Sequence, residues 1–241
     1  MIKPYYFITA IILAALFSCS NNTPKNGAQK TTDYLDSIRT ADKINQETMQ
    51  KEDSMALYAW GDATFGMTMN EALKTDAFNS AERYDNSLSL NLDNTIALSK
   101  SLGLHMWLGV WADFEGADKK ELSLVRISSN YDSQYAPYFA EDLNKIVNEF
   151  KSKYGEPERL INNYKTISVS DIKYGDDIEI AFWMIGSGKG ENGTKFITIK
   201  AVKEMPTVSH HTIDIRITNT DFPKNKKVNT TSENNTVRQS F

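Results

Sequence analysis

The chain has 241 residues, with 27 Lys and Arg against 31 Asp and Glu, so its formal net charge is −4. This mildly acidic balance argues against the basic surface of a nucleic-acid-binding protein. The chain contains a single cysteine, which excludes an internal disulfide and leaves a packed core to stabilise the fold.

A short apolar run occupies the N-terminus. Residues 5–17 are apolar apart from one threonine, and the run ends at Leu16-Phe17-Ser18-Cys19. This run is shorter than the roughly 20 residues that a membrane-spanning helix needs, but it has the length of the apolar region of a secretory signal. We therefore predict a signal peptide over residues 1–18.

The ending of this run resembles the lipobox of bacterial lipoproteins, in which the cysteine becomes the lipidated N-terminus. The resemblance implies that Cys19 carries lipid chains such as palmitate. Two or three such chains form a stable membrane anchor, because each buried methylene contributes roughly 0.8 kcal/mol. Ser20 in place of Asp implies transfer to the outer membrane, and the lack of a following acidic run favours the periplasmic face.

A polar tether and stalk are expected over residues 19–57. Residues 20–32 are mainly Asn, Thr, Lys, Gln and Gly without an apolar cluster, which is typical of a flexible tether. Residues 33–58 are polar and contain neither Gly nor Pro. Their loose apolar periodicity favours a solvated helix.

A short capped helix is predicted near the start of the globular domain. Thr68 and Glu71 have the spacing of a capping box, so a helix is expected over residues 69–75. The pattern Gly-Met-Thr-x-x-Glu, soon followed by strands, resembles the opening of the small α+β lipoproteins that assist outer-membrane barrel assembly. The resemblance covers only this short stretch, and we transfer no function from it.

Three strands are predicted in the first half of the domain. Residues 87–92 carry leucine at every second position, and residues 104–114 are strongly apolar. Residues 115–118 have the composition of a turn, and residues 121–128 return as a strand. The last two strands therefore predict a β-hairpin.

The clearest helix follows this hairpin. Its apolar residues recur at spacings of three or four and form one stripe: Phe139, Leu143, Ile146, Val147, Phe150 and Tyr154. Pro137 lies at its start, and Gly155 follows it as a C-cap. These signals predict an amphipathic helix between Pro137 and Gly155.

Four more strands are predicted, over residues 164–172, 177–185, 194–202 and 212–218. In the last strand, isoleucines alternate with polar residues, as expected when one face is buried. Short connections favour an antiparallel meander, which one long helix can cover. We therefore predict an α+β fold in which an antiparallel meander sheet packs on one long amphipathic helix.

The predicted domain covers residues 58–220. The following residues, 221–241, return to a composition of Asn, Lys, Thr and Ser. We predict that this tail is disordered.

Two motifs resemble nucleotide-binding sites but lack the required context. Residues 188–193 match G-x-G-x-x-G, but a strand pattern follows instead of a helix, so a hairpin loop is expected. Residues 174–177, Tyr-Gly-Asp-Asp, resemble the metal-binding hairpin of RNA-dependent polymerases. Gly-Asp is also an ordinary turn pair, and a small exported domain has no room for the rest of a polymerase.

We predict no metal site, no cofactor and no enzymatic activity. His210 and His211 are neighbours in a strand pattern and so point to opposite faces. Asp113, Glu115 and Asp118 flank the hairpin turn without the spacing of a calcium-binding loop. The mature chain contains neither the G-x-S-x-G pattern of serine hydrolases nor the H-E-x-x-H pattern of zinc proteases.

Tryptophans mark a candidate binding surface. Trp107 and Trp111 share the face opposite the aliphatic one in the predicted strand 104–114, and Trp183 lies in a later strand. Large aromatic residues usually serve core packing, but an exposed apolar patch can bind a protein or a ligand. We therefore name these three tryptophans as candidate binding residues.

Together these features predict a membrane-anchored, non-enzymatic lipoprotein whose α+β domain binds an envelope protein or another envelope component. Two alternatives stay open. An enzyme acting on envelope polymers would need a cleft lined by several carboxylates. A carrier of small amphiphiles would need an apolar cavity beside Trp107 and Trp111.

Overall fold

The computed structural model describes residues 27–116, 119–186, 192–203 and 210–220, with side chains from residue 38 onward. The predicted signal peptide, its Cys19 and the predicted tail lie outside these residues. The described chain belongs to two compact units, Met1–Glu47 and Thr48–Phe241.

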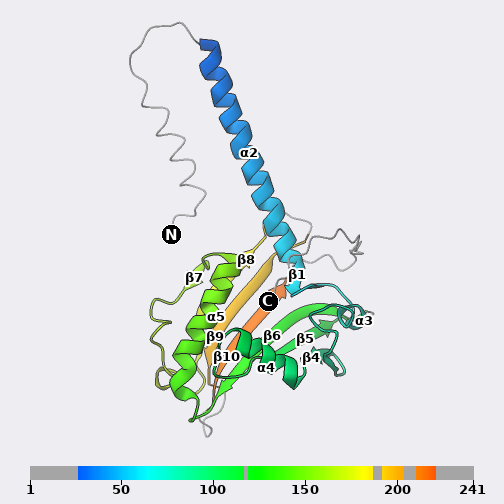
Figure 1. Cartoon of the computed structure of the whole chain (residues 1–241), viewed down its shortest axis with the longest axis vertical. Helices are drawn as coiled ribbons and strands as arrows, with labels where there is room; N and C mark the ends of the chain where they lie inside the picture. The colour runs from blue at the N-terminus through cyan, green and yellow to red at the C-terminus, as the bar shows by residue number, and fades with distance from the viewer. Residues whose placement is uncertain (1–26, 117–118, 187–191, 204–209, 221–241) are drawn as a thin grey trace. The chain divides into compact units, whose positions relative to one another are not determined.

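The first described element is the long helix α2, Gly27–Leu57 (Figure 1). Its side chains from residue 38 to residue 51 are exposed apart from the half-buried Ala41. The predicted helical stalk is confirmed, but the helix already begins at Gly27, so the expected tether is wrong for residues 27–32. No helix in the described part of the chain is both long and apolar enough to cross a membrane.

Within the second unit, side chains of the domain hold the last turns of α2. Asn192 donates to the Asp53 carboxylate through its backbone N–H (3.2 Å) and its side-chain amide (2.9 Å). Asn219 donates to the carbonyl oxygen of Ala56 (3.1 Å), and Ala56 is fully buried. The end of α2 is therefore part of the packed domain.

The domain contains an eight-stranded antiparallel sheet in the order β3-β4-β5-β6-β10-β9-β8-β7. Its strands are β3 (Glu82–Arg83), β4 (Ser87–Ser89), β5 (Gly109–Glu115), β6 (Glu121–Tyr131), β7 (Arg159–Leu160), β8 (Asp177–Ile185), β9 (Lys195–Val202) and β10 (His211–Asn219). A separate two-stranded ribbon joins β1 (Tyr58–Trp60) to β2 (Ala63–Thr64). The α+β class with an antiparallel sheet is therefore confirmed.

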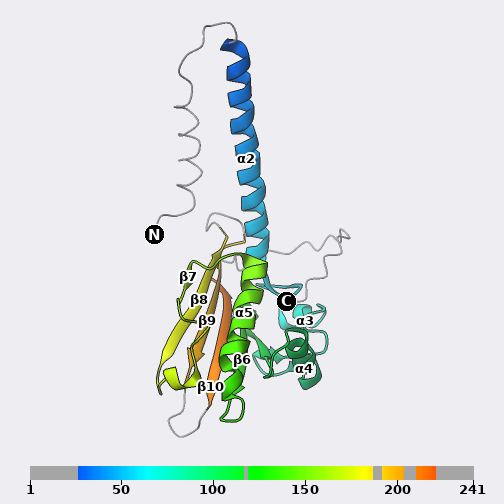
Figure 2. The ribbon, with the colours of Figure 1, turned by 60° about the vertical axis from the view of Figure 1, so that its left-hand side comes forward.

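The order of the strands is not a simple meander. The chain leaves β6 through α5, Phe139–Tyr154, and reaches the far edge of the sheet at β7 (Figure 2). Strands β8, β9 and β10 then return to the centre, where β10 pairs with β6 and Ile215 lies opposite Ile127. The antiparallel sheet therefore consists of two meanders, β3 to β6 and β7 to β10, which α5 connects across the width of the sheet.

Helix α5 was predicted with its correct position and face. Pro137 lies in the short 3₁₀ helix η1, Ala136–Tyr138, which leads into it. Gly155 caps its end with φ 81°, a left-handed conformation that glycine adopts without steric cost. The apolar stripe is buried from Phe139 to Phe150, and the C-terminal Tyr154 of the stripe is half-buried.

Three local predictions need correction. The capping box of Thr68 and Glu71 is confirmed, but the helix α3 that it starts, Met69–Ala72, is shorter than expected. Residues 90–92 are not a strand, because the helix α4, Leu92–Ser101, begins there. Residues 164–172 are not a strand either, and they contain the 3₁₀ helix η2, Val169–Asp171.

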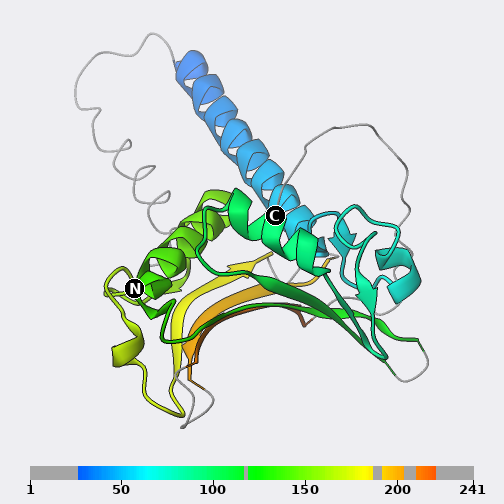
Figure 3. The same ribbon diagram turned by 60° about the horizontal axis from the view of Figure 1, so that its bottom comes forward.

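The core lies between the sheet and the helices on one of its faces. Alternate residues of β9 and β10 are buried there, among them Ile199 and Ile215. Figure 3 shows α4 and α5 over this same face. In the described part of the chain no helix covers the opposite face, which carries ion pairs such as Arg126–Asp113 (2.6 Å).

Candidate functional site

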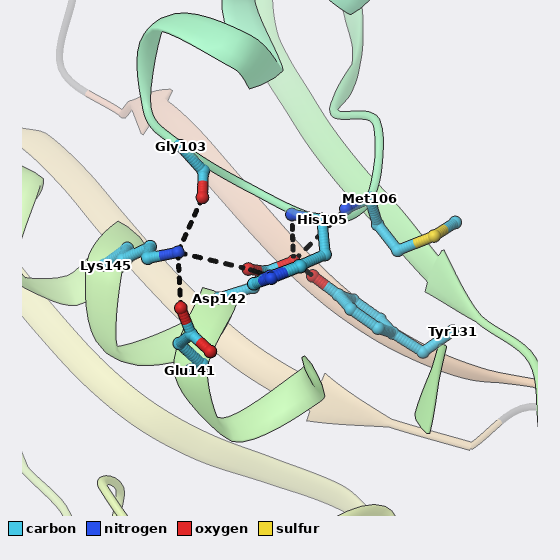
Figure 4. Close-up of polar contacts among 7 residues, drawn as sticks. All are labelled: Gly103, His105, Met106, Tyr131, Glu141, Asp142 and Lys145. Carbon is cyan, nitrogen blue, oxygen red and sulfur yellow. Dashed lines mark hydrogen bonds and ion pairs between the residues drawn. The ribbon is translucent and has the colours of Figure 1, made fainter. Parts of the chain in front are cut away.

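A buried carboxylate joins α5 to the segment before β5. Asp142 lies in the first turn of α5 and is 0% exposed (Figure 4). Its Oδ2 atom accepts hydrogen bonds from the backbone N–H groups of His105 (2.9 Å) and Met106 (3.2 Å). Because a buried charge without partners is very costly, these donors are needed to keep the carboxylate inside the fold.

Two side chains also contact the carboxylate of Asp142. The hydroxyl of Tyr131, on β6, donates to Oδ2 (2.9 Å), and the His105 ring places Nδ1 2.8 Å from Oδ1. Burial and the nearby Asp142 charge raise the pKa of Tyr131 well above its usual value. Tyr131 therefore remains protonated and keeps donating its hydrogen bond at physiological pH.

Lys145 holds the other side of the same segment. Its Nζ atom donates to the carbonyl oxygen of Gly103 (2.6 Å) and lies 2.7 Å from the Glu141 carboxylate and 4.0 Å from that of Asp142. The bond from Lys145 lowers the pKa of Glu141. At the end of the segment, the buried hydroxyl of Ser99 accepts from the N–H of Leu108 (2.8 Å).

These contacts define what we call the clamped loop, residues 103–108. It is irregular in backbone conformation, yet Gly103, His105, Met106 and Leu108 are each bonded to α4 or α5. A loop fixed at several points loses little conformational entropy when it binds a partner. The clamp therefore prepares this loop as a rigid surface element.

His105 presents one ring nitrogen away from the clamp. A carboxylate oxygen accepts hydrogen bonds, so Nδ1 is the donor in the contact with Asp142, and Nε2 takes no part in that contact. The ring stacks on Tyr138 with centroids 4.0 Å apart and is partly exposed. Asp–His pairs also orient catalytic triads, but no described serine, threonine or cysteine is hydrogen-bonded to His105.

The contacts described above therefore fix the position of the clamped loop on the domain. Among the described residues no group of three or more His, Cys, Asp or Glu side chains could hold a metal ion. Two aromatic side chains are exposed at this place. Trp107 lies within the clamped loop and is 53% exposed, and the Tyr138 ring that stacks on His105 is also exposed.

The three candidate tryptophans do not form one surface. Trp111 is half-buried on the helix-free face of β5. Trp183 is 2% exposed, packs on Phe150 with ring centroids 5.8 Å apart and donates to the carbonyl of Gly155 (2.9 Å). Trp183 therefore does not lie on an exposed surface, because α5 packs on the face of β8 that carries it.

The other sequence motifs occupy turns and strand ends. His211 is buried at the start of β10 while His210 is exposed. Gly175 lies in a turn with φ 83°, and Asp113 pairs with Arg126. Asp118 and residues 187–191 lie outside the described residues. The strands on either side of residues 187–191, β8 and β9, pair as the predicted hairpin.

Comparison with known proteins found no matching family model, no similar curated protein and no similar solved structure.

Sequence reasoning missed the clamp, although one signal for it was present. Asp142 lies three residues after Phe139 and four before Ile146, so it falls on the apolar stripe of α5. A charged residue on a buried stripe must find partners inside the fold. Its partners His105 and Tyr131 come from distant parts of the chain, and nothing local identifies them.

Proposed function

We propose that this protein is a membrane-anchored, non-enzymatic lipoprotein whose α+β domain binds another envelope protein through the clamped loop. The observation that carries the proposal is the exposure of Trp107 on a loop held by the buried Asp142. Tryptophan is enriched among residues that dominate binding energies. A rigid backbone beneath it reduces the entropy lost on binding.

The anchor is proposed from the N-terminal sequence. The lipobox-like ending at Cys19 supports lipidation and placement at the periplasmic face of a bacterial outer membrane. Residues 27–47 of α2 are helical and would extend about 30 Å at about 1.5 Å per residue. Such a polar helix suits a spacer that follows a lipidated N-terminus.

The two alternatives gain no support from the hollows of the described domain. Among the described residues, the larger hollow has Lys173, Lys203 and His211 in its lining and no carboxylate side chain. The described lining of the smaller hollow contains one carboxylate, that of Glu149. Neither hollow is lined by Trp107 or Trp111, as a carrier site at these tryptophans would require.

The anchor is tested by expressing the full chain and a Cys19→Ala variant in a bacterium with an outer membrane. We expect the wild-type protein to incorporate an alkyne analogue of palmitate and to fractionate with membranes. The variant should lose the label and leave the membrane fraction while keeping its circular dichroism spectrum. Persistence of the variant in membranes contradicts the anchor.

The contact surface is tested by placing a photo-crosslinking amino acid at position 107 of the lipidated protein in living cells. Position 84 is the matched control, because Tyr84 is exposed to the same degree on another turn of the domain. We expect a discrete crosslinked protein from position 107 only. Equal products from both positions, or none from position 107, contradict this use of the loop.

A further inference from the structure

An open hollow of about 540 Å³ lies where β9 ends and β10 begins. Its lining includes Ala136, Ile172, Lys173, Tyr174, Lys203 and His211. This volume falls within the roughly 300–1,000 Å³ of typical small-molecule sites. None of the residues of the clamped loop lines it, so it is a separate site.

The lining brings two lysines together from distant segments. Lys173 follows η2, and Lys203 follows β9. Backbone hydrogen bonds fix these segments against each other, because the N–H of Gly175 donates to the carbonyl of Lys203 (3.0 Å). The two positively charged residues are therefore held at one opening by the fold.

Neither lysine is paired with a carboxylate in the described part of the chain. The carboxylate of Asp176 accepts from the backbone N–H of Lys173 (2.7 Å). That of Asp171 accepts from the N–H and the hydroxyl of Ser168 (2.8 and 2.9 Å), which lowers the pKa of Asp171. Both neighbouring acids thus cap their own turns, and the two ammonium groups remain available to an anion.

The rest of the lining combines apolar and polar side chains. Ala136, Val169 and Ile172 contribute aliphatic groups, and Tyr174 contributes an exposed aromatic ring. The polar groups come from Ser133, Ser170 and His211. An inorganic ion would make no favourable contact with the apolar side chains. An organic anion could pair its acid group with the lysines and bury its body against these apolar side chains.

We propose that this hollow binds a small organic anion that joins a carboxylate or phosphate group to an apolar body. Lys173 and Lys203 hold the acid group, and the body packs on Ile172 and Tyr174. The site does not depend on the proposed protein contact at the clamped loop, and binding can be measured whether or not that contact exists.

The test is titration calorimetry on the full chain in nanodiscs of uncharged lipid, with naphthyl phosphate as the probe and empty nanodiscs as the blank. We expect saturable binding at one site. The double variant Lys173→Gln/Lys203→Gln should bind about tenfold more weakly or worse, because charge-assisted contacts are lost. The matched control Lys74→Gln/Lys100→Gln, at two exposed positions, should bind like the wild type.

Two further arms separate charge from apolar contact. Inorganic phosphate and neutral naphthyl glucoside should each bind more weakly than naphthyl phosphate. Tyr174→Ala, at an exposed position, should weaken naphthyl phosphate but not inorganic phosphate. The proposal is overturned if the double variant folds and binds like the wild type, if inorganic phosphate binds as tightly as naphthyl phosphate, or if naphthyl phosphate does not bind.

Discussion

Lys195, at the start of β9, places an ammonium group in the core, where it is 1% exposed. Its Nζ donates to the carbonyl oxygen of Tyr58 (3.0 Å) and lies 4.6 Å from the centre of the Tyr154 ring. Burial, together with the charge of Lys153, lowers the pKa of Lys195 to about 7. The fold thus favours the neutral form of this side chain.

This lowered pKa predicts a pH-dependent stability. The pKa of a lysine in the unfolded state is about 10.4. Between about pH 7 and 10 the unfolded state therefore binds more protons than the folded state. The free energy of unfolding should therefore rise with pH across this window and level off above it. Lys195→Met should remove this rise, as measured by urea unfolding at several pH values.

The control for this experiment is Lys100→Met, since Lys100 is exposed on α4. That variant should keep the dependence of the wild type. A rise of equal size in the Lys195→Met protein would mean that other groups cause it.

The clamp makes a second prediction at the scale of single residues. Asp142→Asn replaces an acceptor with an amide whose N–H₂ group would face donors, so we expect a loss of about 1–3 kcal/mol in the free energy of unfolding. Tyr131→Phe removes one hydrogen bond and should cost about 1 kcal/mol. Chemical denaturation measures both, and an Asp142→Asn protein as stable as the wild type would rule out a stabilising role for the clamp.

At the scale of elements, local patterns predicted those structures whose signals are carried by neighbouring residues. The stripe of α5 and the capping box at Thr68 are such signals, and both are confirmed. The leucines at positions 88, 90 and 92 misled, because Leu88 is buried in β4 while Leu92 starts α4 and is 57% exposed. Alternation over so few residues fits a continuous strand, but it fits a short strand followed by the start of a helix equally well.

The helix that this pattern concealed depends on its cap. Asn91 accepts from the backbone N–H of Asn94 (2.9 Å) and donates to the carbonyl of Ser80 (3.1 Å). Asn91→Ala should lower the free energy of unfolding by about 1 kcal/mol. Asn91→Asp keeps the capping oxygen and should cost less; equal losses in both variants would show that the bond to Ser80 matters more than the cap.

At the scale of the whole molecule, the last strand lies in the middle of the sheet. β10 pairs with β6 along eight residues of each strand, and its isoleucines are buried beneath the helices. The edge strands β3 and β7 have two residues each. The two halves of the sheet are therefore joined by a pairing that forms only when the end of the domain meets its middle.

This topology predicts the order of amide hydrogen exchange. Amides of β6, β9 and β10 should exchange last, at rates set by global unfolding, whereas those of β3 and β7 should exchange first by local opening. Mass spectrometry of peptic fragments after deuterium labelling measures this order. Earlier exchange in β10 than in β4 would contradict the central role of the β6–β10 pairing.

The sequence by itself determined what adjacent residues can encode: the apolar run before Cys19, the stripe and caps of α5, the β5–β6 hairpin and the alternation in β10. Only the tertiary structure decided that β10 joins β6, that Asp142 meets His105, and that Lys173 lies near Lys203. These partners are far apart in the chain, and their meeting depends on which strand edges and helix faces remain to be covered. No local period records that choice, because it is made by the packing of the whole domain.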